Sequence, residues 1–251
     1  ALAISILGFI DDFLNLNWKM KIFFQFIFVS VPIFFLNQTI NFEIFIGLNF
    51  SGRLNFILTI LWIIVLMNSL NFIDNMDGFA AINSSFICLA LTILSFVYNQ
   101  NYLADISFIL LLTLLGFTVY NFPPAKLYMG DSGSLFIGFI FGFISILFDW
   151  NPSGESYLYS SIAPIFLFFT IPLLDFSTVF VYRIKNNISP AVGGTDHISH
   201  RLLNQGNSVK KVLLLISYLN IYIFILLGLT IISYSLSVFV FIIYLGTIIL
   251  L

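Results

Sequence analysis

Residues 54–78 read LNFILTILWIIVLMNSLNFIDNMDG. The stretch 54–73 has no charged side chain, and Asp74, Asp77 and Gly78 follow it at once. About 20 apolar residues are what an α-helix needs to cross the roughly 30 Å hydrocarbon core of a bilayer. The stretch therefore predicts a transmembrane helix that ends in an acidic turn at the membrane surface.

The composition of the whole chain agrees with this local pattern. Of its 251 residues 60% are hydrophobic and only 8% are charged, with a mean hydropathy of +1.08. Such values are typical of polytopic membrane proteins and exclude a soluble domain. We expect spans near 22–36, 54–73, 80–98, 104–122, 134–150, 160–182, 212–232 and 234–251, with residues 1–10 as the end of another.

Backbone groups in lipid need partners within the chain, so these spans must be helices. We predict an all-α transmembrane bundle with about eight or nine spans, forming a single membrane domain over residues 1–251. The chain has no initiator Met and both ends are apolar. We therefore expect a fragment that lacks N-terminal helices. Cys88 is the only cysteine, which excludes a disulfide within the chain.

Lysine and arginine predict the orientation of the bundle, because cytoplasmic loops carry an excess of them. One set of alternate loops holds eight of the nine cations, and the opposite set holds only Arg53. The first set is therefore predicted to be cytoplasmic. Four acidic motifs lie on that same side. They contain Asp11-Asp12, Asp74 with Asp77, Asp131, and Asp196 with His197 and His200.

The first motif is Gly8-Phe-Ile-Asp-Asp12, followed by Lys21 and, one helical turn later, Gln25. Adjacent carboxylates cost free energy unless a cation or a proton offsets them. The pair is either a solvated turn or a site in which an Asp faces a metal or an acidic substrate while Lys21 neutralises a phosphate.

The second motif places Asn68, Asn71, Asp74 and Asp77 about three residues apart, which predicts one polar stripe on a helix. Polar groups at membrane depth are costly unless they face a cavity or one another. A polar helix cap would explain Asp77-Gly78 alone. Four such groups together favour a site.

The third motif, residues 121–134, reads NFPPAKLYMGDSGS. Pro123 and Pro124 should end one helix, and the next is predicted to begin after Gly133 with Ser132 or Ser134 as its cap. The N-terminus of that helix and Lys126 favour an anion. Asp131 is placed to bind a hard cation such as Mg²⁺, although an ordinary capped turn is the simpler alternative.

The fourth motif lies in the longest cytoplasmic loop, where residues 196–202 read DHISHRL. Two imidazoles alone make an incomplete metal site. With Arg201 beside them, a pyrophosphate-binding loop is the better interpretation, and a solvated basic loop is the alternative. Asp175 differs because it lies inside the span 160–182, either for function or for a buried hydrogen bond.

Together the four motifs resemble those of the polyprenyl-phosphate N-acetylhexosamine-1-phosphate transferase family. They occur in the order of that family and cover nearly the whole chain. The resemblance implies that a lipid carrier phosphate, usually undecaprenyl phosphate, attacks the β-phosphate of a UDP-N-acetylhexosamine. UMP is released and Mg²⁺ is required.

The resemblance also implies roles for the motif residues. Asp131 would bind Mg²⁺, and Asp11 or Asp12 would act on the lipid phosphate as a base, as an orienting group or as a covalent nucleophile. The remaining candidate residues would contact substrate. Asn71, Asp74 and Asp77 would line the nucleotide side, His197, His200 and Arg201 would contact the diphosphate, and Lys21 and Lys126 would bind phosphate.

One departure bears on the substrate, because Ser199 stands where the family usually has the middle histidine of its motif. We therefore expect a UDP-GlcNAc-type donor, with the phospho-N-acetylmuramoyl-pentapeptide transferases of peptidoglycan synthesis as the alternative enzyme. An ion-coupled transporter is the alternative from another class. We expect a site at the cytoplasmic face of a bacterial plasma membrane and no nucleic-acid partner. A homodimer is left open.

Overall fold

The computed structural model describes residues 1–40, 52–150, 162–190 and 192–232, and in these ranges it contains helices and no strand. The predicted all-α bundle is therefore confirmed. The helices are α1 (Leu2–Leu14), α2 (Trp18–Leu36), α4 (Gly52–Ile73), α5 (Phe79–Val97), α6 (Asn101–Asn121), α7 (Gly130–Leu147), α8 (Ile162–Phe168), α9 (Thr170–Lys185), α10 (Ile198–Asn204) and α11 (Val209–Ile232).

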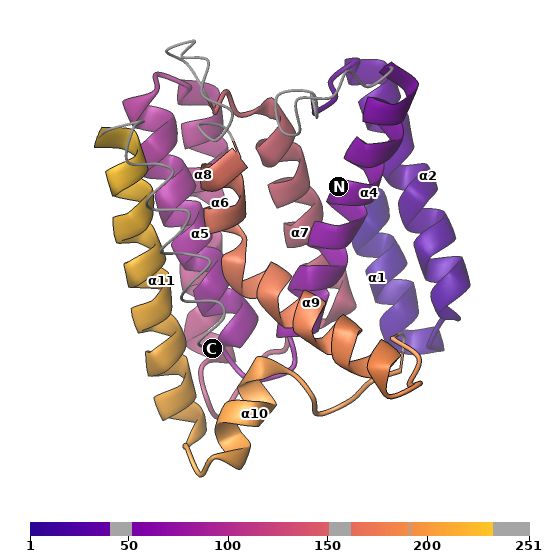
Figure 1. Ribbon diagram of the computed structural model, residues 1–251, viewed down its shortest axis with the longest axis vertical. Helices are drawn as coiled ribbons and strands as arrows, with labels where there is room; N and C mark the ends of the chain where they lie inside the picture. The colour runs from indigo at the N-terminus through magenta and orange to yellow at the C-terminus, as the bar shows by residue number, and fades with distance from the viewer. Residues whose placement is uncertain (41–51, 151–161, 191, 233–251) are drawn as a thin grey trace.

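Six of the described helices are long and apolar enough to cross a membrane, namely α2, α4, α5, α6, α7 and α11. Each coincides with a span expected from the sequence. The expected span 234–251 lies outside the described residues. Most of the long helices stand roughly upright and side by side, whereas α9 runs obliquely across them and α10 lies at the lower end of the bundle (Figure 1).

Helices α4 and α7 form the centre of the bundle, because both contribute to each of its two hydrophobic clusters. One cluster joins them to α5, α6, α8 and α11, with Phe141 and Phe169 among its buried side chains. The other joins them to α1 and α2 through residues such as Ile4 and Val29. The end of α4 and the start of α7 that carry acidic motifs are therefore held rigidly.

The structure differs from the expected span 160–182, which is two helices instead of one. The helical run stops at Phe169, and α9 starts again at Thr170 with Pro172 in its first turn. Proline has no N–H to donate and its ring crowds the carbonyl four residues earlier, so it fits the first turn of a helix and favours a break or a kink just before it. The break lets α9 leave the direction of α8 (Figure 1).

The close approach of α4 and α7 depends on Gly138. A Cβ atom there would lie 2.5 Å from the Cα of Met67, which is backbone and cannot yield, whereas a Cβ on Gly116 of α6 would meet nothing within 4 Å.

We therefore expect Gly138→Ala to lower the unfolding temperature, with a cost of about 1–3 kcal/mol for overpacking. Gly116→Ala serves as the matched control and should be neutral or slightly stabilising, because alanine favours helix by about 1 kcal/mol over glycine. Thermal unfolding in detergent measures both. Equal unfolding temperatures for the two variants would contradict this account of the α4–α7 contact.

Candidate active site

Lys21 on α2 lies between carboxylates of two other helices. Its Nζ is 2.9 Å from Oδ2 of Asp11 on α1 and also donates to Oδ2 of Asp131 on α7. All three side chains are largely withdrawn from solvent. Three of the predicted residues, which come from the first and third motifs, therefore meet at one ammonium group.

Asp131 receives a further contact from α4. Nδ2 of Asn71 donates to Oδ1 of Asp131 at 2.6 Å and lies 3.0 Å from the hydroxyl of Ser134. Both oxygens of Asp131 thus have a donor, one charged and one neutral. The carboxylate is held in place on both sides.

Asp12 has different hydrogen-bond partners from its neighbour Asp11. Its two oxygens accept hydrogen bonds from the backbone N–H groups of Asp131 and Ser132, at 2.9 and 3.3 Å. These are free donors in the first turn of α7, which favours an anion. Asp12 therefore caps α7 from another helix.

This arrangement corrects the expected start of α7. The helix begins at Gly130 and not after Gly133, and neither Ser132 nor Ser134 caps it. Gly130 has φ +63°, and a Cβ atom there would lie 2.8 Å from Oδ2 of Asp12. A side chain at this position would therefore be strained and would also displace the capping carboxylate.

Asp74 lies in the turn after α4 and is half-buried. Burial, followed by the negative charge of Asp131, raises its pKa to about 7, with Asp12 and Asp77 adding to the effect and a backbone hydrogen bond from Gly130 opposing it. The acidic cluster, which we define as Asp11, Asp12, Asp74 and Asp131, thus carries more negative charge than Lys21 offsets.

Asp77 and Gly78 connect this turn to the segment between α6 and α7. Oδ2 of Asp77 accepts from the backbone N–H of Ala125 at 2.9 Å, and Gly78 donates its N–H to Oδ1 of Asn121. Asp77 therefore holds the 122–129 segment in place. Its negative charge also acts on Asp74 of the acidic cluster. Lys126 in that segment is exposed, and no contact among the described residues joins it to the cluster.

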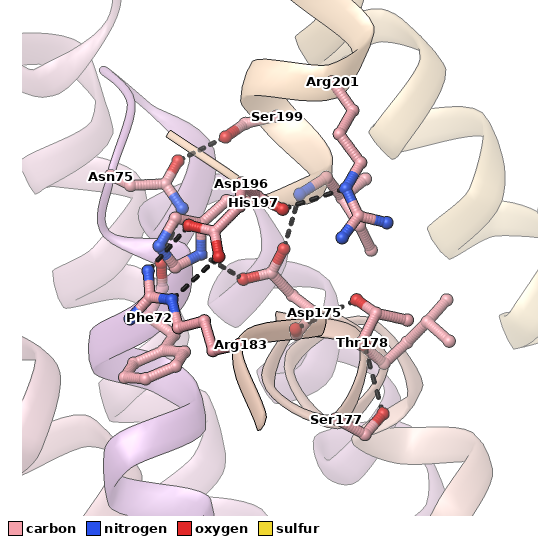
Figure 2. Close-up of polar contacts among 12 residues, drawn as sticks. Phe72, Asn75, Asp175, Ser177, Thr178, Arg183, Asp196, His197, Ser199 and Arg201 are labelled. Carbon is pink, nitrogen blue, oxygen red and sulfur yellow. Dashed lines mark hydrogen bonds and ion pairs between the residues drawn. The ribbon is translucent and has the colours of Figure 1, made fainter. Parts of the chain in front are cut away.

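The fourth motif is held in place by Asp175, whose side chain is fully buried. Its Oδ2 lies 2.7 Å from Nδ1 of His197, and its Oδ1 accepts from the N–H of Ile198 at 2.6 Å (Figure 2). The hydrogen-bond interpretation of Asp175 is the one the structure supports. The ring of His197 also meets Phe72 of α4 edge-on, at 5.4 Å between centroids, and His200 lies 6.3 Å away.

Arg183 at the end of α9 fixes the loop that precedes α10. It makes two 2.7 Å hydrogen bonds to the carboxylate of Asp196 and donates to the carbonyls of Pro190 and Val192. The hydrogen bonds from Arg183 hold the pKa of Asp196 below its usual range. The sequence analysis counted Arg183 only among the loop cations, and its position directly after the expected span 160–182 does not indicate that it is buried.

Two further contacts tie the loop to the rest of the site. Ser199 is buried and donates to Oδ1 of Asn75, next to Asp74, and Nε of Arg201 donates to the carbonyl of Asp196 (Figure 2). A buried small hydroxyl therefore occupies the position where a histidine was expected from the resemblance.

A cavity of about 400 Å³, which we call the Lys21 cavity, opens between α2, α4 and α9. Lys21, Asn68 and Asn71 form its polar end, and apolar side chains that include Phe176 and Phe180 form its walls. Asn68 is oriented by a 2.8 Å hydrogen bond to Gln25, a buried residue of α2. The cavity thus places an ammonium and two amides at the end of an apolar slot.

Comparison with known proteins agrees with this geometry. Residues 1–149 match the model of glycosyl transferase family 4. The chain belongs to this family. The match covers the first three acidic motifs, through Asp131, and ends before α8.

Two relatives are similar over a longer range of the chain. A probable undecaprenyl-phosphate N-acetylglucosaminyl 1-phosphate transferase of Bacillus subtilis is 30% identical over 86% of this chain and 60% of its own length. A decaprenyl-phosphate N-acetylglucosaminephosphotransferase of Mycolicibacterium smegmatis is 31% identical over 64% of the chain and 43% of its own length.

A phospho-N-acetylmuramoyl-pentapeptide-transferase of Staphylococcus aureus is 33% identical over 58% of the chain and 50% of its own length. The chain thus spans about two fifths to three fifths of the length of these relatives.

The raised pKa of Asp74 gives a test of the acidic cluster. In the folded protein Asp74 keeps its proton up to about pH 7, whereas an unfolded chain loses it near pH 4. The folded state therefore binds more protons between these values, and the free energy of unfolding should fall as pH rises through this window.

We expect Asp74→Asn, measured with EDTA present, to raise the unfolding temperature at pH 8 and to change it little at pH 5. Asp105→Asn, at an exposed carboxylate of α6, should give the same small difference at both pH values. If the unfolding temperatures of Asp74→Asn and of the wild type change with pH in the same way, the repulsion assigned to the cluster is wrong.

Proposed function

We propose that this protein transfers an N-acetylhexosamine-1-phosphate, with N-acetylglucosamine as the sugar, from a UDP-sugar to a polyprenyl phosphate. The observation that carries the proposal is that Lys21 and Asn71, which both contact Asp131, also line an apolar cavity. Such a cavity suits a phosphate on a lipid tail. The names of the Bacillus and Mycolicibacterium relatives support the carrier lipid and the sugar.

In this proposal the lipid phosphate lies at the Lys21 end of the cavity, with its chain between α2, α4 and α9. Lys21 supplies a compact positive charge suited to phosphate. Asn68 and Asn71 line the same cavity, where their side-chain amides donate to Gln25 and Asp131. In this proposal the site faces the cytoplasm, an orientation that the excess of lysine and arginine in the loops on that side supports.

The residues of the acidic cluster fit a divalent cation. Among the described residues there is no preformed group of three or more His, Cys, Asp or Glu side chains that could hold a metal. Mg²⁺, however, is bound by one or two carboxylates together with substrate phosphates. Asp131 would hold it, with Asp74 beside it, and a bound Mg²⁺ would supply neutralisation of phosphate charge.

The reaction forms one bond and breaks one. An oxygen of the lipid phosphate bonds to the β-phosphorus, and the bond from that phosphorus to the bridging oxygen breaks, which releases UMP. Asp12 is occupied with the first amides of α7, so we assign it to positioning. Asp11 lies beside Lys21 and is the carboxylate that would orient the lipid phosphate or accept its proton.

The nucleotide sugar would approach from the side of Asn71, Asp74 and Asp77. His197, His200 and Arg201 would contact its diphosphate, and the buried Asp175 would keep His197 in place. Lys126, which is exposed, would join them only through a movement of its segment or of its own long side chain. In-line attack between two anions needs this neutralisation above all.

A peptidoglycan-type transferase is the second candidate, because the Staphylococcus relative is as similar in identity over a shorter range. The two functions differ in the donor alone. UDP-MurNAc-pentapeptide would be used in place of UDP-GlcNAc, with UMP as the product in both cases.

The test is UMP release by the purified protein with undecaprenyl phosphate, Mg²⁺ and each donor in turn. We expect release only with all components and with UDP-GlcNAc. Asp131→Asn should reduce the rate by at least about 100-fold, the size of effect seen when one charge-stabilising group is removed. Asp105→Asn should keep the wild-type rate. A folded protein that releases no UMP with any donor would overturn the proposal.

A further inference from the structure

A second cavity, of about 980 Å³, lies between α9 and the loop that leads to α10. Its wall on α9 includes Ser177, Thr178 and Val181, and its wall on the loop includes Ile188 and Val192. The Lys21 cavity meets α9 through Phe176 and Phe180 instead. With 3.6 residues per turn these two sets lie on different faces of the helix, so α9 separates the two cavities.

The polar part of this α9–α10 cavity is positively charged. Arg183 and Asp196 both line it, but they neutralise each other through paired hydrogen bonds. Two further cations, Lys185 and Arg201, line it as well and are exposed. Arg201 extends from α10 toward Thr178 with only its Nε engaged by the carbonyl of Asp196 (Figure 2). The cavity therefore has two cations without a carboxylate partner among the described residues.

The rest of the cavity is apolar and open to its surroundings. Val181 and Tyr182 are 48% and 47% exposed, and Val192 is 56% exposed. These side chains are continuous with an exposed apolar surface of α9 that includes Ile184. A ligand for this cavity must therefore combine an anionic head with apolar chains.

We propose that the α9–α10 cavity binds the headgroup of an anionic phospholipid of the surrounding membrane. Its phosphate lies between Lys185 and Arg201, hydroxyls of Ser177 and Thr178 face the polar headgroup, and the acyl chains lie along Val181, Tyr182 and Ile184. A free phosphate would use the cations but would leave the apolar wall exposed, which is why the bilayer is the source. The α9 wall separates this site from the acidic cluster. Arg201 is shared with the proposed transfer reaction, whereas Lys185 has no part in that reaction and therefore carries the test of this site.

The test measures which lipids the purified protein retains. Wild-type protein exchanged into detergent with phosphatidylglycerol or phosphatidylcholine is examined by native mass spectrometry. We expect phosphatidylglycerol to be retained preferentially. Lys185→Gln should weaken its retention about fivefold, the effect of one cation near a lipid phosphate, and Val181→Trp, which fills the apolar part, should abolish it. Lys210→Gln, at an exposed lysine of α11 outside the cavity, is the matched control and should retain the lipid normally.

Two results would overturn the proposal. One is equal retention of phosphatidylglycerol by wild type, Lys185→Gln and Val181→Trp. The other is displacement of the lipid by millimolar glycerol 3-phosphate, which would mark a site for a soluble phosphate. Lys185→Gln changes an exposed side chain, so it tests the site even where Val181→Trp disturbs the fold.

Discussion

The ammonium group of Lys21 is the interaction on which the acidic site depends. It reaches from α2 to Asp11 on α1 and Asp131 on α7, while Asn71 on α4 bonds the other oxygen of Asp131. Four helices thus meet at one carboxylate. Asp12 adds to this junction by accepting the first amides of α7. The position of α7, and with it that of Asp131, is fixed by electrostatics at the end where apolar packing stops.

The oblique helix α9 positions the loop that carries His197, which forms the second part of the site. Its buried edge carries Asp175, Val179 and Arg183, which are four residues apart and face the bundle and the loop. Asp175 and Arg183 each bind part of the segment that carries His197, so the loop is tied to the helix at two points. The other faces of α9 line the two cavities. Helix α9 therefore anchors the loop that carries His197 and also separates the two cavities.

The sequence predicts the spans and the residues of the site better than it predicts their partners. Apolar length is a property of consecutive residues, so α4, α5, α6 and α11 were predicted within a few residues. Asp11, Lys21, Asn71 and Asp131 were identified because charge at a membrane edge is costly without a reason. The break at Phe169 was missed because α8 and α9 are both apolar. The only sign of the break is Pro172, which a helix accepts in its first turn.

Partner choice is harder to predict because it depends on tertiary distance. The serines after Asp131 are good caps by type, yet a carboxylate 119 positions earlier in the chain takes their place. Likewise, nothing in the local sequence pairs Asp175 with His197 or Ser199 with Asn75. These contacts join segments whose spacing in sequence carries no period, so only the packed bundle determines them.

The balance of charge also limits how the proposed reaction can proceed. A phosphate that enters the Lys21 cavity competes with Asp11 and Asp131 for the same ammonium. Burial, followed by the negative charge of Asp131, raises the pKa of Asp74 to about 7, so further negative charge is already disfavoured there without a substrate. Two phosphorylated substrates would add several charges of the same sign. In the proposed reaction a cation would enter with them, and Asp131, whose carboxylate is held from both sides before any ligand arrives, would receive it.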